Sequence, residues 1–306
     1  MSQHEGRGGR TRQLRRLGLG ALLLALGALA LTLFWPDRVV VPMVLQPGQK
    51  LDALQADRSP APDPLVAIFP PLTAVVLPQE TDGRARIAIV LDDMGPDRTA
   101  LTRASDLPVA VTFAFLPYAA NVRALANSAR GSGRNVLLHM PMEPVGAADP
   151  GPGALLVDQP PGEQIARLDA ALAKFDLLDG VNNHMGSRLT ADRDTMDRVM
   201  ARLAGRDLFF LDSRTTAKTV AAEAAQHAGL ATLSRDVFLD PDGTGAMAEA
   251  QLQRTLEIAS ATGTAIAIGH PHRRTLDALE RFVATLDRTQ FRMVRLSDLI
   301  PVSAGR

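Results

Sequence analysis

The chain has 306 residues, 33 basic and 33 acidic side chains, no cysteine and 46% hydrophobic residues. This length allows one large α/β domain or two smaller domains, with ample core to bury. The lack of cysteine excludes disulfides, thiolate metal sites, iron–sulfur clusters and a cysteine nucleophile. The zero net charge argues against a protein that works by wrapping nucleic acid, so no nucleic-acid partner is expected.

The first 35 residues have the pattern of a membrane anchor. Residues 1–16 hold five arginines against a single glutamate, and residues 17–35 are uncharged. A helix of the latter length spans roughly 28 Å, close to the thickness of the bilayer hydrocarbon. The positive-inside rule, with Trp35 at the interface, predicts a basic cytoplasmic tip at 1–16 and a transmembrane helix at 17–35. A cleaved signal peptide and a buried helix are the alternatives.

Residues 36–83 are rich in proline and lack sustained periodicity, which is typical of an extended linker. The remaining residues, 84–306, are predicted to form the catalytic domain. Together these features predict a single-pass protein of the inner (cytoplasmic) membrane. The N-terminal helix would contact the membrane, and the domain would face the periplasm or the exterior.

From residue 84 onward, short apolar runs alternate with amphipathic ones, as in βα units around a mostly parallel sheet. The predicted strands are Ile87–Leu91, Val109–Phe115, Asn135–His139, Gly180–Asn182, Leu208–Leu211 and Thr264–Gly269. The predicted helices are Asp97–Ser105, Asn121–Arg130, Gly162–Phe175, Arg193–Ala204, Thr216–Ala228, Met247–Ala261 and Thr275–Leu286. This succession favours a closed, barrel-like α/β domain, and an open doubly wound sheet is the alternative.

Polar side chains follow the C-terminal ends of the predicted strands, the edge at which α/β proteins carry their chemistry. In chain order they are Asp92, Asp93, His139, His184, Asp212, Ser213, Arg214, His270 and His272. Carboxylates and imidazoles on one edge are a suitable donor set for Zn²⁺ or a similar divalent ion. The sequence therefore indicates a metal-dependent hydrolase.

Each of these residues also has a purely structural interpretation. One carboxylate of the aspartate pair can hold a metal while its neighbour stays free as a base, but Asp93 can equally cap the following helix. His139 is either a ligand or a hydrogen-bonded core residue, and His184 is either a site residue or a turn residue. Glu143 follows the third strand between two prolines that stiffen the backbone. His270 can protonate a leaving group, because the pKa of histidine lies near neutrality.

Other polar residues near the same edge are candidates for supporting contacts. They are Asn182, Asn183 and Ser187, as donors to the ligands or the substrate, and Asp212 and Arg214, as a carboxylate–guanidinium pair. That pair would either fix the site or a substrate, or serve as a plain structural ion pair. We interpret the segment Asp236–Asp240 as scaffolding or a mobile loop.

Five ordered motifs resemble those of the divergent polysaccharide deacetylases, relatives of the NodB-type carbohydrate esterases. They are Ile89–Gly95, Leu138–Pro144, Asn182–Ser187, Phe210–Thr215 and Arg235–Asp240. The resemblance covers about residues 84–300. It implies a deformed (β/α) barrel of about seven strands and a divalent metal, with zinc as the expected ion.

The resemblance also implies roles for individual residues. Asp92 resembles the general base of that family, Asp93 a metal ligand and His139 the first histidine of a His-x-x-x-His pair. Glu143 stands where the second histidine of that pair is expected, so the third ligand is either Glu143 or, by preference, His184. His270 resembles the late histidine that acts as general acid. The family's arginine–proline motif has no clear counterpart.

The function implied by the resemblance is the metal-dependent removal of N-acetyl groups from amino sugars of envelope glycans, with a glycan as substrate. The replaced histidine and the missing arginine motif favour an alternative, a catalytically silent domain that binds or scaffolds envelope glycans. A hydrolase for another bond, such as a phosphoester, is a third hypothesis. It is weaker because no glycine-rich phosphate loop or basic cluster is evident on the predicted edge.

Overall fold

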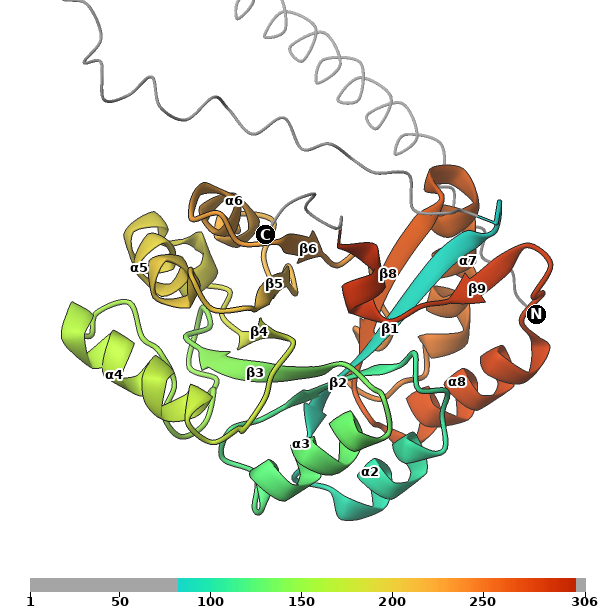
Figure 1. Cartoon of the computed structure of the whole chain (residues 1–306), viewed down its shortest axis with the longest axis horizontal. Coiled ribbons are helices and arrows are strands. Elements are labelled where there is room, and N and C mark those ends of the chain that lie inside the picture. The colour runs from blue at the N-terminus through green and yellow to red at the C-terminus, as the bar shows by residue number, and fades with distance from the viewer. Residues whose placement is uncertain (1–81, 301–306) are drawn as a thin grey trace, which may run out of the picture. The chain divides into compact units, whose positions relative to one another are not determined.

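The computed structural model describes residues 82–300, which contain nine strands. The strands are β1 (Ala85–Met94), β2 (Thr112–Phe115), β3 (Val136–Met142), β4 (Gly180–Met185), β5 (Phe209–Asp212), β6 (Thr232–Ser234), β7 (Val237–Phe238), β8 (Thr264–Gly269) and β9 (Phe291–Met293). Every pairing among them is parallel, in the order β6-β5-β4-β3-β2-β1-β8-β7, and β9 also pairs with β1. Figure 1 shows this sheet running through the middle of the fold.

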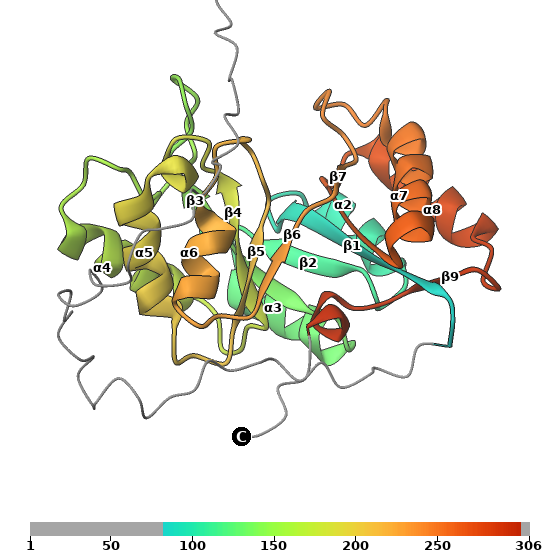
Figure 2. The ribbon, with the colours of Figure 1, turned by 90° about the horizontal axis from the view of Figure 1, so that it is seen from above.

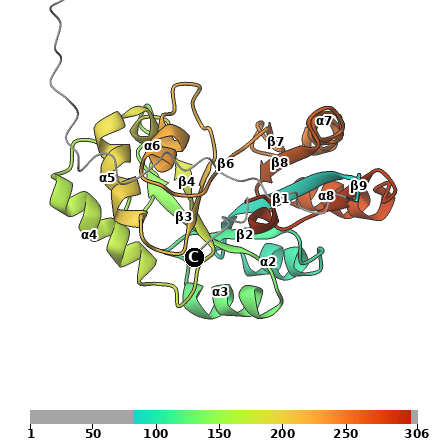
Figure 3. The ribbon, with the colours of Figure 1, turned by 45° about the horizontal axis from the view of Figure 1, so that its top comes forward.

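Seven α-helices within the described residues lie along the outer side of the curled sheet (Figures 2 and 3). They are α2 (Arg98–Ser105), α3 (Val122–Gly131), α4 (Pro161–Leu172), α5 (Arg193–Leu203), α6 (Ala221–His227), α7 (Ala248–Thr262) and α8 (Arg273–Thr285). Two short 3₁₀ helices are η2 (Leu189–Ala191) and η3 (Leu296–Leu299). Local capping sets several helix ends. Asp97 accepts from the N–H of Ala100 at the start of α2, and Gly263 ends α7 with φ at 81°.

The predicted α/β architecture is confirmed as a curled half-barrel of parallel strands with helices outside. The expected closed barrel of about seven strands is corrected, because β6 and β7 are the two edges of the described sheet. The chain passes directly from one edge to the other through Arg235 and Asp236. The Arg235 N–H donates to Asp212 O at 3.0 Å, and the Asp236 N–H donates to Ile266 O at 2.9 Å. This crossing segment, Arg235–Asp236, therefore links the β5 side of the sheet to the β8 side.

Two apolar clusters pack on the two faces of the sheet. The larger joins outward strand residues such as Ile89, Phe113 and Leu138 to the helices. The smaller contains inward strand residues such as Val90, and Leu296 of η3 packs against them. Each large side chain buried in this way contributes about 1.5–3 kcal/mol. Since the inner cluster stops short of the C-terminal strand ends, that end of the half-barrel is left to polar residues.

The three shortest strands, β6, β7 and β9, were not predicted. They have two or three residues each, too few for an alternating pattern to register. Helix α6 begins at Ala221, five residues after its predicted start at Thr216. The residues between are held in a loop, in which Thr219 Oγ1 donates to Asp212 Oδ2 at 3.0 Å. Tertiary contacts therefore override local helix propensity there.

No helix within residues 82–300 is long and apolar enough to cross a bilayer. Described helices such as α8 bury one face, including Leu276 and Leu279, and leave the other polar. The predicted single-pass location in the inner membrane is corrected accordingly, because no described helix supports a membrane anchor. The predicted tip at 1–16, the anchor at 17–35 and nearly all of the linker at 36–83 lie outside the described residues.

Candidate metal centre

Strand alternation brings the predicted site residues to the inner face of the half-barrel. Successive side chains of a strand point to opposite faces, so every second residue lies on the same side. An inward apolar residue is followed two positions later by a polar one on each of four strands. The pairs are Val90 and Asp92, Leu137 and His139, Leu211 and Ser213, and Ile268 and His270. The apolar inner cluster thus turns into a ring of polar groups at the C-terminal strand ends.

Asp93 joins this ring because the strand alternation breaks beside it. The pairing of β1 with β2 shifts register between Leu91 and Met94, and Asp93 has φ at 55°. A left-handed conformation at a non-glycine residue costs on the order of 1 kcal/mol or more. Met185 and Arg214, which with Asp93 line a cavity at the C-terminal strand ends, have φ at 50°. Backbone strain is therefore concentrated at three strand ends around the site.

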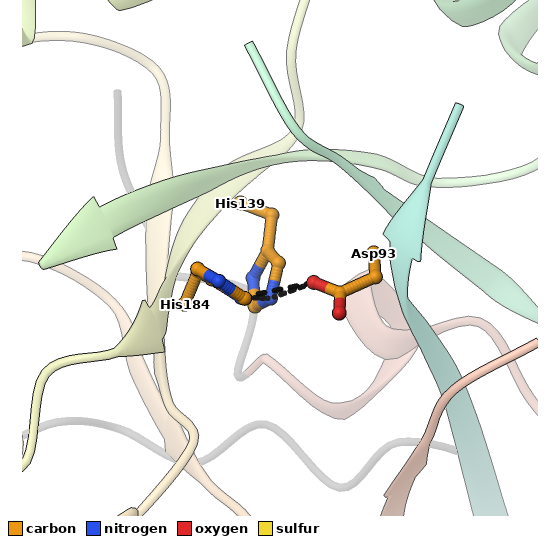
Figure 4. Close-up of side chains that lie close together, drawn as sticks. All are labelled: Asp93, His139 and His184. Atoms are coloured by element: carbon orange, nitrogen blue, oxygen red, sulfur yellow. Dashed lines mark hydrogen bonds and ion pairs between the residues drawn. The ribbon is translucent and has the colours of Figure 1, made fainter. Parts of the chain in front are cut away.

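Three potential ligand atoms converge at the C-terminal ends of β1, β3 and β4 (Figure 4). Asp93 Oδ1 lies 2.9 Å from His184 Nδ1 and 3.3 Å from His139 Nε2. The two ring nitrogens are 3.2 Å apart. Each of these residues comes from a different strand or strand end, so only the folded sheet assembles the group.

The donor set fits a divalent metal ion. Zinc bonds of about 2.0–2.1 Å in tetrahedral geometry place neighbouring ligand atoms roughly 3.3 Å apart, close to the spacings found here. Asp93 Oδ1 is buried and makes no hydrogen bond of good geometry, although two imidazole nitrogens lie beside it. A buried carboxylate oxygen without a hydrogen bond is rare, and coordination of a cation would satisfy it. Asp93 does not cap α2, since Asp97 does.

The charges of this group are strongly coupled. Burial opposes ionisation of Asp93, but the adjacent imidazoles of His139 and His184 outweigh it and lower the pKa of Asp93. Burial likewise opposes the charge on His139, yet the carboxylates of Asp92 and Asp93 raise its pKa. Asp92 is fully enclosed, and burial raises its pKa despite the nearby imidazoles.

Asn182 connects the candidate base to a candidate ligand. Its Nδ2 donates to Asp92 Oδ1 at 2.9 Å and to Ser213 Oγ at 3.2 Å. Its Oδ1 is then left to accept from His139 Nδ1 at 2.9 Å. This contact puts the proton of a neutral His139 on Nδ1 and leaves Nε2 free to bind a metal.

His270 faces the same group from β8. Its Nε2 lies 3.8 Å from Asp93 Oδ2, while its Nδ1 contacts Asp240 Oδ1 at 2.9 Å. Asp240 is buried, and its Oδ2 accepts from the His270 N–H at 2.7 Å and from Thr275 Oγ1 at 2.8 Å. Burial disfavours the charged imidazole, but the hydrogen bond to Asp240 and the charges of Asp92, Asp240 and Asp93 raise the pKa of His270 to about 9.

Glu143 and Ser187 support a loop rather than the ligand group. Glu143 Oε2 accepts from the Val157 N–H at 2.7 Å, and its Oε1 pairs with Arg188. Ser187 Oγ accepts from the Val145 N–H at 2.8 Å. Both contacts hold the segment that follows β3.

Asn183 and Asp212 brace the ends of β4 and β5. Asn183 Oδ1 accepts from the Ser213 N–H at 2.9 Å, and its Nδ2 donates to Met185 O at 2.8 Å. Asp212 accepts from the backbone N–H of Arg214 at 2.8 Å instead of from the guanidinium that we expected it to pair with. The side chain of Arg214 is exposed and lines the cavity.

A model of the divergent polysaccharide deacetylases matches residues 89–300. The chain belongs to this family. It is 36% identical over 197 residues to an uncharacterized protein of Haemophilus influenzae, covering 64% of this chain and 70% of that protein. It is 35% identical over 216 residues to the uncharacterized protein YibQ of Escherichia coli K12, covering 70% and 67%.

A solved structure has a similar fold. The crystal structure of uncharacterized protein ATU2773 from Agrobacterium tumefaciens C58 aligns with a TM-score of 0.68 at 29% sequence identity. The alignment covers 72% of this chain and 91% of that structure. The aligned share of this chain is similar in extent to residues 89–300, which the family model matches.

Sequence reasoning overlooked two features of this family member's site. Arg235 and Phe238 line the cavity, and Asp240 holds His270, whereas the segment Asp236–Asp240 was interpreted as scaffolding or a mobile loop. The interpretation as scaffolding is correct for Asp240, but the side chain that Asp240 holds, His270, belongs to the site. The available signal was the Arg235–Asp240 motif itself, which is one of the five motifs that carry the resemblance to the family.

Proposed function

We propose that this protein is a metal-dependent amide hydrolase that removes N-acetyl groups from amino-sugar glycans. The observation that carries the proposal is the set of three ligand atoms 2.9–3.3 Å apart, flanked by one buried carboxylate and one carboxylate-bound imidazole. They line a cavity of about 340 Å³, which suits a sugar-sized group. Membership of the deacetylase family supports the same chemistry.

Asp93 Oδ1, His139 Nε2 and His184 Nδ1 are the atoms that would hold the ion. A bound divalent ion, zinc in our proposal, would supply Lewis-acid polarisation of the acetyl carbonyl and acidify the attacking water. Around it, Asn182 keeps His139 in the ligand tautomer through the 2.9 Å contact with Nδ1.

Asp92 is the proposed general base. Asn182 occupies its Oδ1, which leaves Oδ2 to face the group, 3.6 Å from His139 Nε2. Because burial raises the pKa of Asp92, its carboxylate is a stronger proton acceptor than an exposed one. It is therefore suited to take the proton from water as the tetrahedral intermediate forms.

His270 is the proposed general acid for the departing amine. Asp240 binds Nδ1 and so leaves Nε2–H directed at the ligand group. With its pKa raised to about 9, His270 carries that proton at neutral pH. Asp240 acts through His270 and is a positioning residue.

Metal content and acetate release test the proposal separately. Asp93→Ala, His139→Ala and His184→Ala should each lose bound zinc by elemental analysis, because each removes one of three protein ligands. Asp92→Asn should keep zinc. Its rate of acetate release from N-acetylated oligosaccharides should fall about 10²–10⁴-fold. Glu143→Gln is the matched control and should keep zinc.

Two results would contradict this assignment. Equal zinc content in the wild type and His139→Ala would exclude the ligand set. Zinc binding without acetate release by the wild type, over a range of N-acetylated glycans, would favour the catalytically silent glycan-binding domain.

A further inference from the structure

Two arginines line the cavity on the side of β5 and the crossing segment. Arg214 follows β5, and Arg235 lies in the crossing segment between β6 and β7. Burial together with the nearby charge of Arg214 lowers the pKa of Arg235, so the two cations lie close enough to repel each other. This basic cluster was not evident in the sequence analysis, because twenty-one positions separate the two residues along the chain.

Arg235 is fixed as part of the cavity wall. Its Nε donates to Ser213 O at 2.6 Å and its Nη2 to Arg214 O at 2.8 Å. Its guanidinium carbon lies 5.1 Å from the centre of the Phe238 ring. Arg235 therefore holds the loop after β5 while it adds positive charge to the wall.

Arg214 has a fixed backbone and an uncommitted side chain. The backbone is held at both ends, since its N–H donates to Asp212 Oδ1 and its C=O accepts from Arg235. Its φ of 50° is a strained conformation that these contacts maintain. Within residues 82–300 its guanidinium has no ion pair, and the side chain is exposed at the cavity.

We propose that Arg214 recognises an anionic group, a carboxylate or a phosphate, carried by the substrate beside its N-acetyl group. The inference rests on the proposed function and deepens it, because it names the class of amino sugar. A guanidinium binds a carboxylate or phosphate through two parallel N–H···O bonds. Arg235 raises the local positive charge, and Asp92 and Asp93, the acidic residues of the cavity, are both engaged with imidazoles. A neutral sugar would leave Arg214 in water.

Equilibrium binding tests this without turnover. Isothermal titration would compare N-acetylmuramic acid with its methyl ester, and N-acetylglucosamine 6-phosphate with N-acetylglucosamine, on zinc-loaded and EDTA-treated protein. The wild type should bind at least one anionic probe tenfold or more tightly than its neutral counterpart. Arg214→Gln should abolish that preference, and the arm that responds identifies carboxylate or phosphate.

Two further variants keep the result interpretable. Arg214→Gly relieves the left-handed strain, so it should fold at least as well as the wild type and still lose the preference. Arg254→Gln is the matched control. It removes an exposed arginine of α7 that pairs with Glu257, and it should keep the preference.

Equal affinity for the charged and neutral probes in the wild type would overturn the inference. So would a preference that persists in Arg214→Gln and disappears with EDTA, because the anion would then bind the metal. Acetate release without any anionic preference would reject this inference alone. An Arg214-dependent preference without acetate release would reject only the hydrolase.

Discussion

At the scale of single residues, Asn182 is the polar group on which most of the site depends. It is completely buried and contacts a candidate base, a candidate ligand and Ser213 at the same time. Every polar atom of its side chain is used, which is the condition under which a buried polar network stabilises a fold. Asp92 and His139 consequently share one fixed arrangement.

Replacing Asn182 with alanine should weaken both the fold and the metal centre. The change leaves Asp92 Oδ1 and His139 Nδ1 buried without partners, at a cost of about 1–3 kcal/mol in the free energy of unfolding. Zinc affinity should fall about 10–100-fold, because the ligand tautomer of His139 is no longer held. Urea unfolding and competitive zinc titration measure the two effects. Asn127→Ala, at an exposed contact with Asp176, should change neither.

The pair of His270 and Asp240 should make the stability of the metal-free protein depend on pH. The pKa of His270 in the folded protein is about 9, against an ordinary value of 6.5, so the protonated form is favoured in the folded state. That stabilisation is complete below about pH 6.5 and is lost as the pH rises through about 9. At most about 3 kcal/mol is involved, at 1.36 kcal/mol per pKa unit.

Urea unfolding in EDTA would test this dependence with His270→Gln as the reference. The gap in unfolding free energy between wild type and variant should be larger at pH 6 than at pH 9.5. A gap that stays constant across this range would show that the imidazole charge does not contribute.

At the scale of elements, adjacent strand ends set the distances between site residues. Strands β4 and β5 pair from Gly180 opposite Phe209 to Asn182 opposite Leu211. A Cβ at Gly180 would lie 2.6 Å from Phe209 O and 2.8 Å from the Phe209 ring. Glycine is therefore required where these strands approach closely, two residues before Asn182.

Gly180→Ala should force β4 away from β5 and destabilise the protein by about 1–3 kcal/mol, the usual cost of overpacking. The displacement should also reduce zinc affinity, because Asn182 moves with its strand. Gly162→Ala in α4 is the matched control. Its added Cβ meets nothing within 4 Å, and it should stabilise the helix slightly. Chemical denaturation of both variants decides the comparison, and equal stabilities would contradict it.

At the scale of the whole molecule, the candidate metal centre joins three parallel strands of an open half-barrel. Its ligands come from β1, β3 and β4, and His270 adds β8 from the other side of β1. A metal ion at this point cross-links strands that are otherwise held by backbone pairing and by the two apolar clusters. The ion would bind the folded state far better than the unfolded chain.

Zinc should therefore raise the melting temperature by an amount that depends on its concentration. At free zinc 1,000-fold above Kd, the gain is about 4 kcal/mol. For a domain of this size, that corresponds to a shift on the order of 10 °C. Calorimetry with zinc and with EDTA would measure it, and His139→Ala should show little response. An equal shift in His139→Ala would place the bound zinc elsewhere.

The sequence by itself determined where along the chain the six longer strands lie and which polar residues follow them. Strand periodicity is local, and parallel strands put their C-terminal ends on one edge, so Asp92, His139 and His270 were predicted to share that edge. The motifs likewise pointed to the family that the comparison shows. These inferences needed only neighbouring residues along the chain.

Only the tertiary structure decided which side chains meet. His184 rather than Glu143 joins Asp93 and His139, because a left-handed turn follows His184 while Arg188 engages Glu143. The open curl of the sheet and the crossing segment that brings Arg235 to the cavity were also beyond the sequence. Such contacts depend on distances of a few ångströms between residues far apart in the chain, whereas the periodicity of one segment carries no information about another.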